Sequence, residues 1–222
     1  MSENFKKAKN FSKLGIETGD VKLNLDKMMK NKEKAVSILT KGVEFLFKKN
    51  KVTYLKGFGS FISDKKISVK GEDGKKKEIE AKNIIIATGS EAMPMPNVEF
   101  DEKTIVSSTG ALSLKEVPKS LVVVGGGYIG LEMGSVWSRL GAEVNVIEFL
   151  DHITPGMDRE ISEEFMKILK KQNIKFHLNR KVTSIKKTNN GVQISTSDKN
   201  GDSKDFNCDV ALISIGRKPF TS

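Results

Sequence analysis

Hydrophobic residues recur with two different periods along the first half of the chain. From residue 25 to residue 46 they are spaced by three, four or seven, which predicts a long amphipathic helix with a lysine-rich outer face and Asn24 as its cap. From residue 52 to residue 79 the spacing is two and glycines interrupt it, which predicts a β-meander. The continuous apolar run at residues 84–87 predicts a buried parallel strand, closed by Thr88, Gly89 and Ser90.

The second half begins with another continuous apolar run, at residues 121–124, which leads directly into glycines. Gly125, Gly127 and Gly130 match the spacing G-x-G-x-x-G. In this pattern the first glycine permits a tight turn, the second lets the backbone approach a pyrophosphate, and the third lets helix pack on strand. Helical spacing continues to residue 140, with Gly141 as the expected stop. A second strand at residues 144–147 then ends in Glu148.

This succession of strand, glycines, helix, strand and terminal carboxylate predicts a dinucleotide-binding site. The N-terminus of the helix is expected to face the phosphates, and the Glu148 carboxylate to accept hydrogen bonds from the ribose hydroxyls. The alternative is a glycine-rich turn that serves only packing.

Further elements are predicted on both sides of this motif. A short helix is expected around residues 111–115, capped by Ser108 or Thr109, and Asp158 is the expected cap of another helix. The residues expected on the inward face of that second helix are Ile161, Phe165, Ile168 and Leu169. Strands are expected at residues 174–178, 182–185, 192–194 and 210–215.

The two halves share a hairpin, a buried strand, a glycine and a proline in the same order. We therefore predict an α/β fold with two Rossmann-like, three-layer ββα domains. Only the second domain carries its own glycine fingerprint, so the first is expected to be incomplete.

Composition narrows the classes of function. The formal charge is +10, but lysines are mixed with acidic residues throughout and aromatic residues make up only 7% of the chain. This favours a solvated surface over a nucleic-acid footprint. Apolar runs are too short to span a membrane, and no signal segment is visible. The single cysteine, Cys208, excludes an internal disulfide and a cysteine-based metal cluster. We expect no nucleic acid, membrane or metal as a partner.

Several stretches resemble the dihydrolipoamide (dihydrolipoyl) dehydrogenases, a group within the pyridine nucleotide-disulfide oxidoreductase family. They read TIVSSTGALSLKEVP (residues 104–118), GGGYIGLEMGSVW, VIEFLDHI, ATGS and CDVALISIGRKPF, and the likeness covers essentially all 222 residues. In that family FAD and NAD domains are interleaved. Electrons pass from dihydrolipoamide to a cysteine pair, then to FAD and then to NAD.

The resemblance implies cofactor positions, domains and partners. The positions for NAD are Gly125, Gly126, Gly127, Tyr128, Ile129, Gly130, Glu148, Val182 and Gly216, and those for FAD are Gly59, Thr88, Gly89 and Ser90. Residues 1–117 are expected to form a partial FAD-binding domain and residues 118–222 an NAD-binding domain. Members of the family form homodimers that serve 2-oxo-acid dehydrogenase complexes in the bacterial cytoplasm or the mitochondrial matrix.

Other parts of the family pattern have no counterpart in this sequence. They are the N-terminal FAD fingerprint, the redox cysteine pair and the lysine after it, the later Gly-Asp flavin motif, and the C-terminal dimer domain with its His-Glu pair. We therefore expect an internal fragment that binds NAD, does not retain FAD and is inactive alone. The resemblance places Glu132 near the flavin and nicotinamide as a supporting residue, whereas its structural alternative is a carboxylate that complements the helix dipole.

Other candidate residues also have structural alternatives. Tyr128 is expected either over a flavin or as an exposed aromatic at a turn. Arg217 and Lys218 can hold an anionic cofactor or form a solvated basic turn. The remaining candidates, His152, His177 and Cys208, are interpreted as structural.

Three hypotheses follow for function. The first is a fragment of a flavoprotein that reoxidises dihydrolipoamide with NAD. The second is a non-catalytic NAD-binding module, or a fragment that needs another polypeptide. The third is another flavoprotein disulfide reductase.

Overall fold

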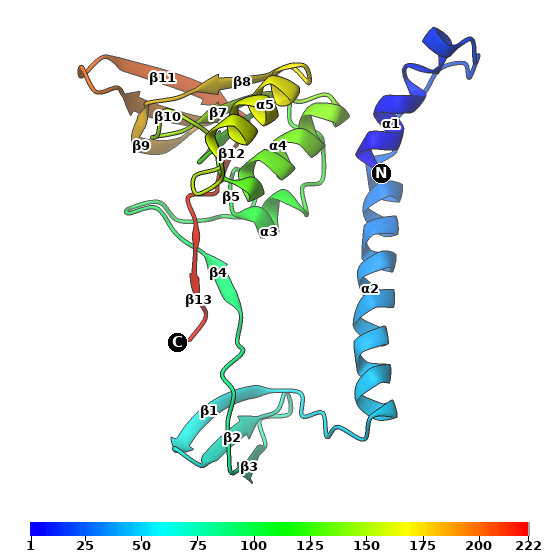
Figure 1. The fold of residues 1–222 in the computed structure, drawn as a ribbon, viewed down its shortest axis with the longest axis vertical. Helices are drawn as coiled ribbons and strands as arrows, with labels where there is room; N and C mark the ends of the chain where they lie inside the picture. The colour runs from blue at the N-terminus through cyan, green and yellow to red at the C-terminus, as the bar shows by residue number, and fades with distance from the viewer. Residues whose placement is uncertain (222) are drawn as a thin grey trace. The chain divides into compact units, whose positions relative to one another are not determined.

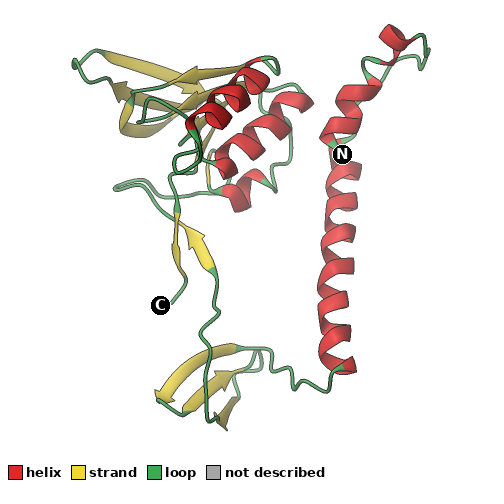
Figure 2. Ribbon diagram, viewed as in Figure 1, coloured by secondary structure: helices red, strands yellow, loops and turns green. Residues whose placement is uncertain are grey.

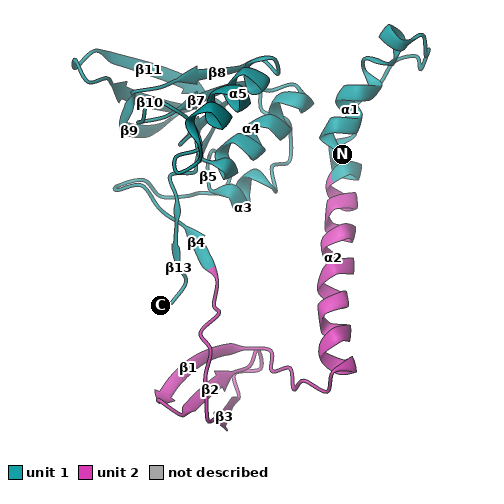
Figure 3. Cartoon of the chain, in the orientation of Figure 1, with its two compact units in different colours: residues 1–28, 90–222 teal, residues 29–89 magenta. Residues whose placement is uncertain are grey.

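The computed structural model describes residues 1–221. Contacts divide the chain into two compact units, one of residues 1–28 and 90–222 and one of residues 29–89 (Figure 3). Helix α2 (Leu25–Lys49) passes through the boundary at residue 28. The predicted boundary between residues 117 and 118 rests on the family pattern and stays a prediction.

A five-stranded sheet forms the centre of the larger unit. Its order is β5-β12-β6-β7-β8, and every neighbouring pair is parallel. The strands are β5 (Ile105–Val106), β6 (Ser120–Val124), β7 (Glu143–Ile147), β8 (Ile174–His177) and β12 (Val210–Ile213). Helix α4 (Tyr128–Leu140) connects β6 to β7, and α5 (Arg159–Lys170) connects β7 to β8. This alternation confirms the predicted α/β class.

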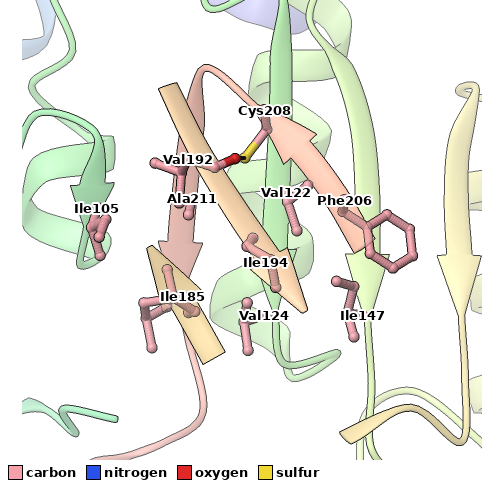
Figure 4. Close-up of a cluster of buried hydrophobic side chains, with 11 residues drawn as sticks. Ile105, Val122, Val124, Ile147, Ile185, Val192, Ile194, Phe206, Cys208 and Ala211 are labelled. Atoms are coloured by element: carbon pink, nitrogen blue, oxygen red, sulfur yellow. Dashed lines mark hydrogen bonds between the residues drawn. The ribbon is translucent and has the colours of Figure 1, made fainter. Parts of the chain in front are cut away.

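Two different layers cover the faces of this sheet (Figure 1). Helices α3 (Ser108–Ala111), α4 and α5 lie on one face, and the antiparallel strands β9 (Lys181–Thr188), β10 (Gly191–Ser197) and β11 (Ser203–Cys208) lie on the other. Along β6, Val123 faces α4, where a Cβ at Gly134 would lie 3.6 Å from its Cγ2. Val122 and Val124 point the other way and pack in one core with Ile194 of β10 (Figure 4). The result is the predicted three-layer ββα arrangement.

Three predicted helix ends in this unit are confirmed. Gly127 is the N-cap of α4, and Gly141 closes that helix with φ of 120°, in the left-handed region that favours glycine. The Asp158 carboxylate caps α5 by accepting hydrogen bonds from the backbone N–H groups of Glu160 and Ile161, at 2.9 and 3.3 Å.

Two helix predictions in this unit were wrong in detail. The short helix occupies Ser108–Ala111 instead of residues 111–115, and it is capped by Ser107, whose Oγ accepts from the Thr109 N–H at 3.1 Å. In α5, Ile161 and Ile168 are exposed, whereas Ser162 and Leu169 are buried. Ser162 can be buried because its hydroxyl is satisfied by the Asp158 carbonyl at 3.0 Å. The predicted inward face is therefore confirmed at Leu169 and wrong at Ile161 and Ile168.

The smaller unit contains most of α2 and a three-stranded antiparallel sheet, drawn in red and yellow in Figure 2. Its strands are β1 (Phe58–Ser63), β2 (Lys66–Lys70) and β3 (Lys76–Glu80). The helix, its Asn24 cap and the meander were predicted correctly, although residues 52–56 form no strand. No residue of α2 is buried among the described residues.

The predicted buried strand at residues 84–87 is wrong. These residues form no strand, and Ile85 is 89% exposed. A strand buried on both faces needs neighbouring strands to satisfy its backbone, and none in the part that the structure describes pairs with this segment. Pairing begins at Ser90, where β4 (Ser90–Ala92) joins β13 (Arg217–Pro219) as an antiparallel pair.

The remaining elements lie near the start of the chain. They are the helix α1 (Ser2–Ala8) and the 3-10 turn η1 (Phe11–Leu14). The Arg139 side chain of α4 contacts α1, donating from Nη1 to Ser2 Oγ at 3.2 Å. This contact attaches the first residues of the chain to the larger unit.

Candidate nucleotide-binding site

The turn between β6 and α4 can be formed only with glycine at its first position. Gly125 has φ of 103°, and its N–H donates to the Ile147 carbonyl of β7 at 2.9 Å. A Cβ at Gly125 would lie 2.5 Å from the Ser214 carbonyl oxygen. Both the backbone conformation and the lack of space therefore require glycine here.

Gly130 and Gly127 meet the other two requirements of the fingerprint. A Cβ at Gly130 would lie 2.6 Å from the Gly125 carbonyl oxygen and 2.7 Å from Val123 Cγ1, so a side chain would push α4 off β6. Around Gly127 the space is open, and no side chain caps the N-terminus of α4. The first N–H groups of this helix are therefore free of a side-chain acceptor.

Glu148, at the end of β7, is 8% exposed and touches the glycine turn directly. Its Oε2 accepts from the Gly126 N–H at 2.6 Å, and its Oε1 accepts from the Leu150 N–H at 2.8 Å. No cation among the described residues forms an ion pair with it. Because each carboxylate oxygen can accept more than one hydrogen bond, ribose hydroxyls can still bind.

These elements surround a cleft of about 910 Å³ at the carboxyl ends of the central strands. Val124, Ile147 and Ile213, the last residues of β6, β7 and β12, all line it. In open α/β sheets ligands bind at this edge, outside the carboxyl ends of the strands. Seven of the positions predicted for NAD line the cleft: Gly125, Gly127, Tyr128, Ile129, Glu148, Val182 and Gly216. Gly126 and Gly130 lie behind it and shape the turn.

Sequence reasoning missed two basic residues of the cleft, Arg180 and Lys181. The residues directly after Glu148 contain no arginine or lysine, but the Arg180 N–H donates to the Glu148 carbonyl at 2.9 Å. This contact between the ends of β7 and β8 joins residues that are distant in sequence. The parallel order of the predicted strands was the only signal that could have suggested it.

The basic residues of β13 have different surroundings. Arg217 lines the cleft, and its Nε donates to Ser90 Oγ at 2.7 Å. Lys218 pairs with Glu91 at 3.1 Å and does not line the cleft. Only Arg217 keeps the interpretation of a residue that can approach an anionic ligand.

The positions implied for FAD do not line this cleft. Gly59 lies in β1, and Thr88 and Gly89 lie in the loop that precedes β4, all three in the smaller unit. Ser90 begins β4 in the larger unit. Their role in binding FAD stays a prediction.

Glu132 and Tyr128 are both exposed side chains of α4. Because α4 begins at Tyr128, Glu132 falls beyond the first turn, and its expected contribution to the helix dipole is weak there. Its role near a flavin stays a prediction. Tyr128 is 66% exposed and lies at the rim of the cleft.

Cys208 is buried in β11, where its Sγ approaches the Val192 carbonyl at 3.8 Å. Burial raises the pKa of this thiol to about 12, so at neutral pH it is protonated and is not a nucleophile.

The two histidines pair with neighbouring polar side chains. His177 Nε2 lies 2.9 Å from Asn145 Oδ1, and burial lowers the pKa of this histidine. His152 Nδ1 lies 2.7 Å from Asp151 Oδ1.

Among the described residues, no group of three His, Cys, Asp or Glu side chains is placed to hold a metal ion. No helix in that part of the chain combines the length and apolar character needed to cross a membrane.

Comparison with known proteins identifies relatives of the whole chain. The dihydrolipoamide dehydrogenase of Chaetomium thermophilum is 58% identical over 209 residues, which are 93% of this chain and 42% of the relative. The mitochondrial dihydrolipoyl dehydrogenase of Pisum sativum is 50% identical over 214 residues, 96% of this chain and 43% of the relative. The chain thus spans about two fifths of the length of these relatives.

Solved structures share the fold. LpdA from Mycobacterium tuberculosis superimposes with a TM-score of 0.87 over 100% of this chain and 48% of that chain, at 22% identity. The HOCl-induced flavoprotein disulfide reductase RclA from Escherichia coli, in its Cu(II) complex, gives a TM-score of 0.75 at 28% identity, over 90% of this chain and 44% of that chain. Residues 3–222 match the family described as pyridine nucleotide-disulphide oxidoreductase. The chain belongs to the pyridine nucleotide-disulphide oxidoreductase family.

Proposed function

We propose that residues 118–222 bind NAD in the cleft at the end of β6 and β7. The observation that carries this proposal is the position of Glu148, whose carboxylate is bonded to the Gly126 N–H and lines the same cleft as Gly127. Glycine turn, open helix N-terminus and carboxylate are the three parts that a dinucleotide site needs. A turn that served only packing would not need an acid buried beside it.

The Glu148 carboxylate also favours NAD over NADP. It can accept hydrogen bonds from both ribose hydroxyls of NAD, whereas it repels the 2′-phosphate of NADP. The carboxylate is held in place by two backbone donors, the Gly126 and Leu150 N–H groups. We therefore expect tighter binding of NAD than of NADP, both because the Glu148 carboxylate can accept the ribose hydrogen bonds and because its charge repels the 2′-phosphate.

For the whole protein, we propose a flavoprotein that reoxidises dihydrolipoamide with NAD through FAD and a redox disulfide, as part of a homodimer in 2-oxo-acid dehydrogenase complexes. The names and identities of the relatives from Chaetomium thermophilum and Pisum sativum support this proposal. In that chemistry FAD passes electrons between the dithiol and NAD. The part assigned to this chain is the binding and orientation of the nicotinamide nucleotide.

The chain's own residues account for the binding step only. Gly125 and Gly130 allow the turn and α4 to approach β6 closely, and the first turn of α4 offers N–H groups to the pyrophosphate. Glu148 orients the adenosine end. The residues of this chain do not account for thiol–disulfide exchange. That reaction proceeds through an attacking thiolate, and Cys208 is a buried, protonated thiol.

A second candidate function is a non-catalytic NAD-binding module, or a polypeptide completed by another chain. The burial of Cys208 favours it for the 222 residues taken alone. The similarity to RclA keeps a third candidate, another flavoprotein disulfide reductase. Since the relatives of Pisum sativum and Canis lupus familiaris are named as mitochondrial, we propose the mitochondrial matrix as location, with the bacterial cytoplasm as alternative.

Calorimetric titration of the full chain with NADH and NADPH tests the nucleotide site. We expect saturable binding of NADH and weaker binding of NADPH. Glu143→Ala is the matched control for later variants of Glu148, because Glu143 is an exposed carboxylate at the other end of β7. Absence of binding for both nucleotides, or equal affinities, would contradict the proposed site.

The catalytic part of the proposal needs a separate assay. NADH formation from dihydrolipoamide and NAD, with FAD added, is expected to be absent for the 222-residue chain. Activity that persists in Cys208→Ser after removal of host enzyme would show that the dithiol step does not need a cysteine of this chain.

A further inference from the structure

Arg180 and Glu148 lie next to each other at one end of the cleft. The Arg180 N–H donates to the Glu148 carbonyl at 2.9 Å, and both residues line the cleft. Arginine is the side chain that binds phosphate with two parallel hydrogen bonds, and an arginine near the ribose is how dinucleotide sites accommodate a 2′-phosphate. The cleft therefore holds an arginine beside Glu148. An arginine there would favour NADP, whereas the Glu148 carboxylate favours NAD.

The Arg180 guanidinium is already occupied. Its Nη1 donates to the Asp202 carbonyl and its Nη2 to Asp202 Oδ2, both at 3.3 Å. The Arg180 side chain is only 17% exposed, whereas that of Asp202 is 71% exposed. Most of the arginine is thus packed, and its charged end meets an acid at the surface.

The position of Asp202 follows from strand pairing. Lys181, the first residue of β9, pairs with Ser197, the last residue of β10. The turn that follows Ser197 therefore begins beside Arg180. Within this turn the Asp202 N–H donates to Asp198 Oδ1 at 2.9 Å, and the Asp198 N–H donates to the Asp202 carbonyl at 3.0 Å. The acid is thereby held at a defined place.

We propose that the Arg180–Asp202 pair is a second determinant of nucleotide specificity, in which Asp202 holds the Arg180 guanidinium and withholds it from the 2′-phosphate of NADP. The inference rests on the proposed nucleotide site and adds a residue to it. Glu148 disfavours NADP because its carboxylate repels the 2′-phosphate. Asp202 disfavours NADP because it pairs with the Arg180 guanidinium, which could otherwise bind that phosphate. A substitution at Asp202 removes the carboxylate that pairs with Arg180, and the guanidinium then keeps only its hydrogen bond to the backbone carbonyl of residue 202.

The test is a double-mutant cycle on the full chain. Affinities for NADH and NADPH are measured by calorimetry for the parent, Asp202→Ala, Arg180→Gln and the double variant. Asp202→Ala is expected to tighten NADPH relative to NADH by about two- to fivefold, because the ion pair that it removes has a solvent-exposed carboxylate and is of modest strength. In the Arg180→Gln background the same substitution is expected to leave the ratio unchanged, because the cation is absent.

Two controls separate this effect from changes in charge or folding. Asp205→Ala removes an equal charge from the neighbouring strand β11, where Asp205 contacts Gln193, and it is expected to leave the ratio at the parent value. Asp202→Asn keeps the shape of the turn and is expected to shift the ratio in the same direction as Asp202→Ala. The gain of both Asp202 variants is expected to fall as salt rises.

The outcomes distinguish the two proposals. If the parent prefers NADH and Asp202→Ala leaves the ratio unchanged, the inference fails and the proposed site stands. The inference is overturned if Asp202→Ala shifts the NADPH-to-NADH affinity ratio as much in the Arg180→Gln background as in the parent. It is also overturned if Asp205→Ala shifts the ratio as much as Asp202→Ala does. Either result would mean that the change in net charge causes the shift. If the parent binds neither nucleotide, the proposed function fails and the inference fails with it.

Discussion

Two apolar segments of similar composition, residues 121–124 and 84–87, have opposite surroundings in this protein. In the first, β6 hydrogen-bonds to β7 and β12, and its four apolar residues are between 0 and 4% exposed. In the second no strand forms, and Ile85 and Ile86 are 89 and 63% exposed. A run of branched apolar residues thus becomes a strand only where neighbouring strands complete its hydrogen bonds.

The same contrast applies to the two sets of predicted cofactor positions. Most of the NAD positions converge on one cleft, and in the turn beside it a Cβ at Gly125 or Gly130 would lie less than 3.0 Å from a neighbouring atom. Among the FAD positions, a Cβ at Gly89 would meet nothing within 4 Å. The two regions therefore differ in how strongly the fold constrains them, and five experiments test this difference.

The largest expected difference is that the chain binds NADH but retains no FAD. The purified full chain is expected to bind NADH and to be colourless, because the glycine turn and helix N-terminus that would hold the FAD pyrophosphate are missing from the sequence. The visible absorption spectrum of the purified protein measures bound flavin directly. Stoichiometric FAD in the preparation would show that residues 59 and 88–90 suffice.

Truncation of the buried segment is expected to be far more costly than truncation of the exposed one. Leu121→Ala should lower the free energy of unfolding by about 2–5 kcal/mol, because it leaves a cavity at a residue with no exposed surface. Ile85→Ala should change it by less than about 0.5 kcal/mol. Denaturant unfolding followed by circular dichroism compares them, and similar losses would mean that Ile85 is buried in solution.

Glycine substitutions should separate the two regions in nucleotide binding. Gly125→Ala is expected to reduce NADH affinity by at least about tenfold, since its Cβ would collide with the Ser214 carbonyl. Gly89→Ala is the matched control, because Gly89 also has positive φ, 77°, but has open space around it. Calorimetry should show parent-like NADH binding for this control. Equal losses in both variants would indicate global destabilisation.

Removal of the Glu148 carboxylate should narrow the preference for NAD. Glu148→Ala is expected to weaken NADH, relieve the repulsion of NADPH and narrow the ratio by about tenfold or more. Because Gly126 N–H and Leu150 N–H lose their acceptor, a loss of stability should accompany it. Glu143→Ala should leave the ratio unchanged and cost little stability, because the ion pair that it removes, with Lys175, is exposed to solvent. An unchanged ratio in Glu148→Ala would make Glu148 a structural residue only.

The smallest expected effect concerns Cys208 and pH. Burial raises the pKa of its thiol from 9.0 to about 12, so above pH 9 the unfolded chain loses a proton that the folded chain keeps. Stability should therefore fall as pH rises from about 9 to about 12. Cys208→Ala should lose this part of the pH dependence. Identical slopes for the parent and the variant, measured by thermal unfolding, would contradict burial of the thiol.

Features that depend on residues close together in the chain could be predicted from the sequence. The glycine turn, the Asp158 cap, the Gly141 stop and the meander were predicted because spacing, capping and turn chemistry act within a few residues. The same reasoning placed Glu148 at the end of its strand. It was wrong for Ile161 and Ile168 of α5, because which face of a helix is buried depends on what packs against it.

Contacts between residues distant in the chain could not be predicted and are set by the packing of the strands. This packing brought Arg180 beside Glu148 through the parallel order of β7 and β8, and it brought Asp202 to Arg180 through the β9–β10 pairing. It also left residues 84–87 without a partner strand. Hydrogen bonds between strands join residues far apart in the chain, so local pattern specifies that a segment can be a strand but not which neighbour completes it.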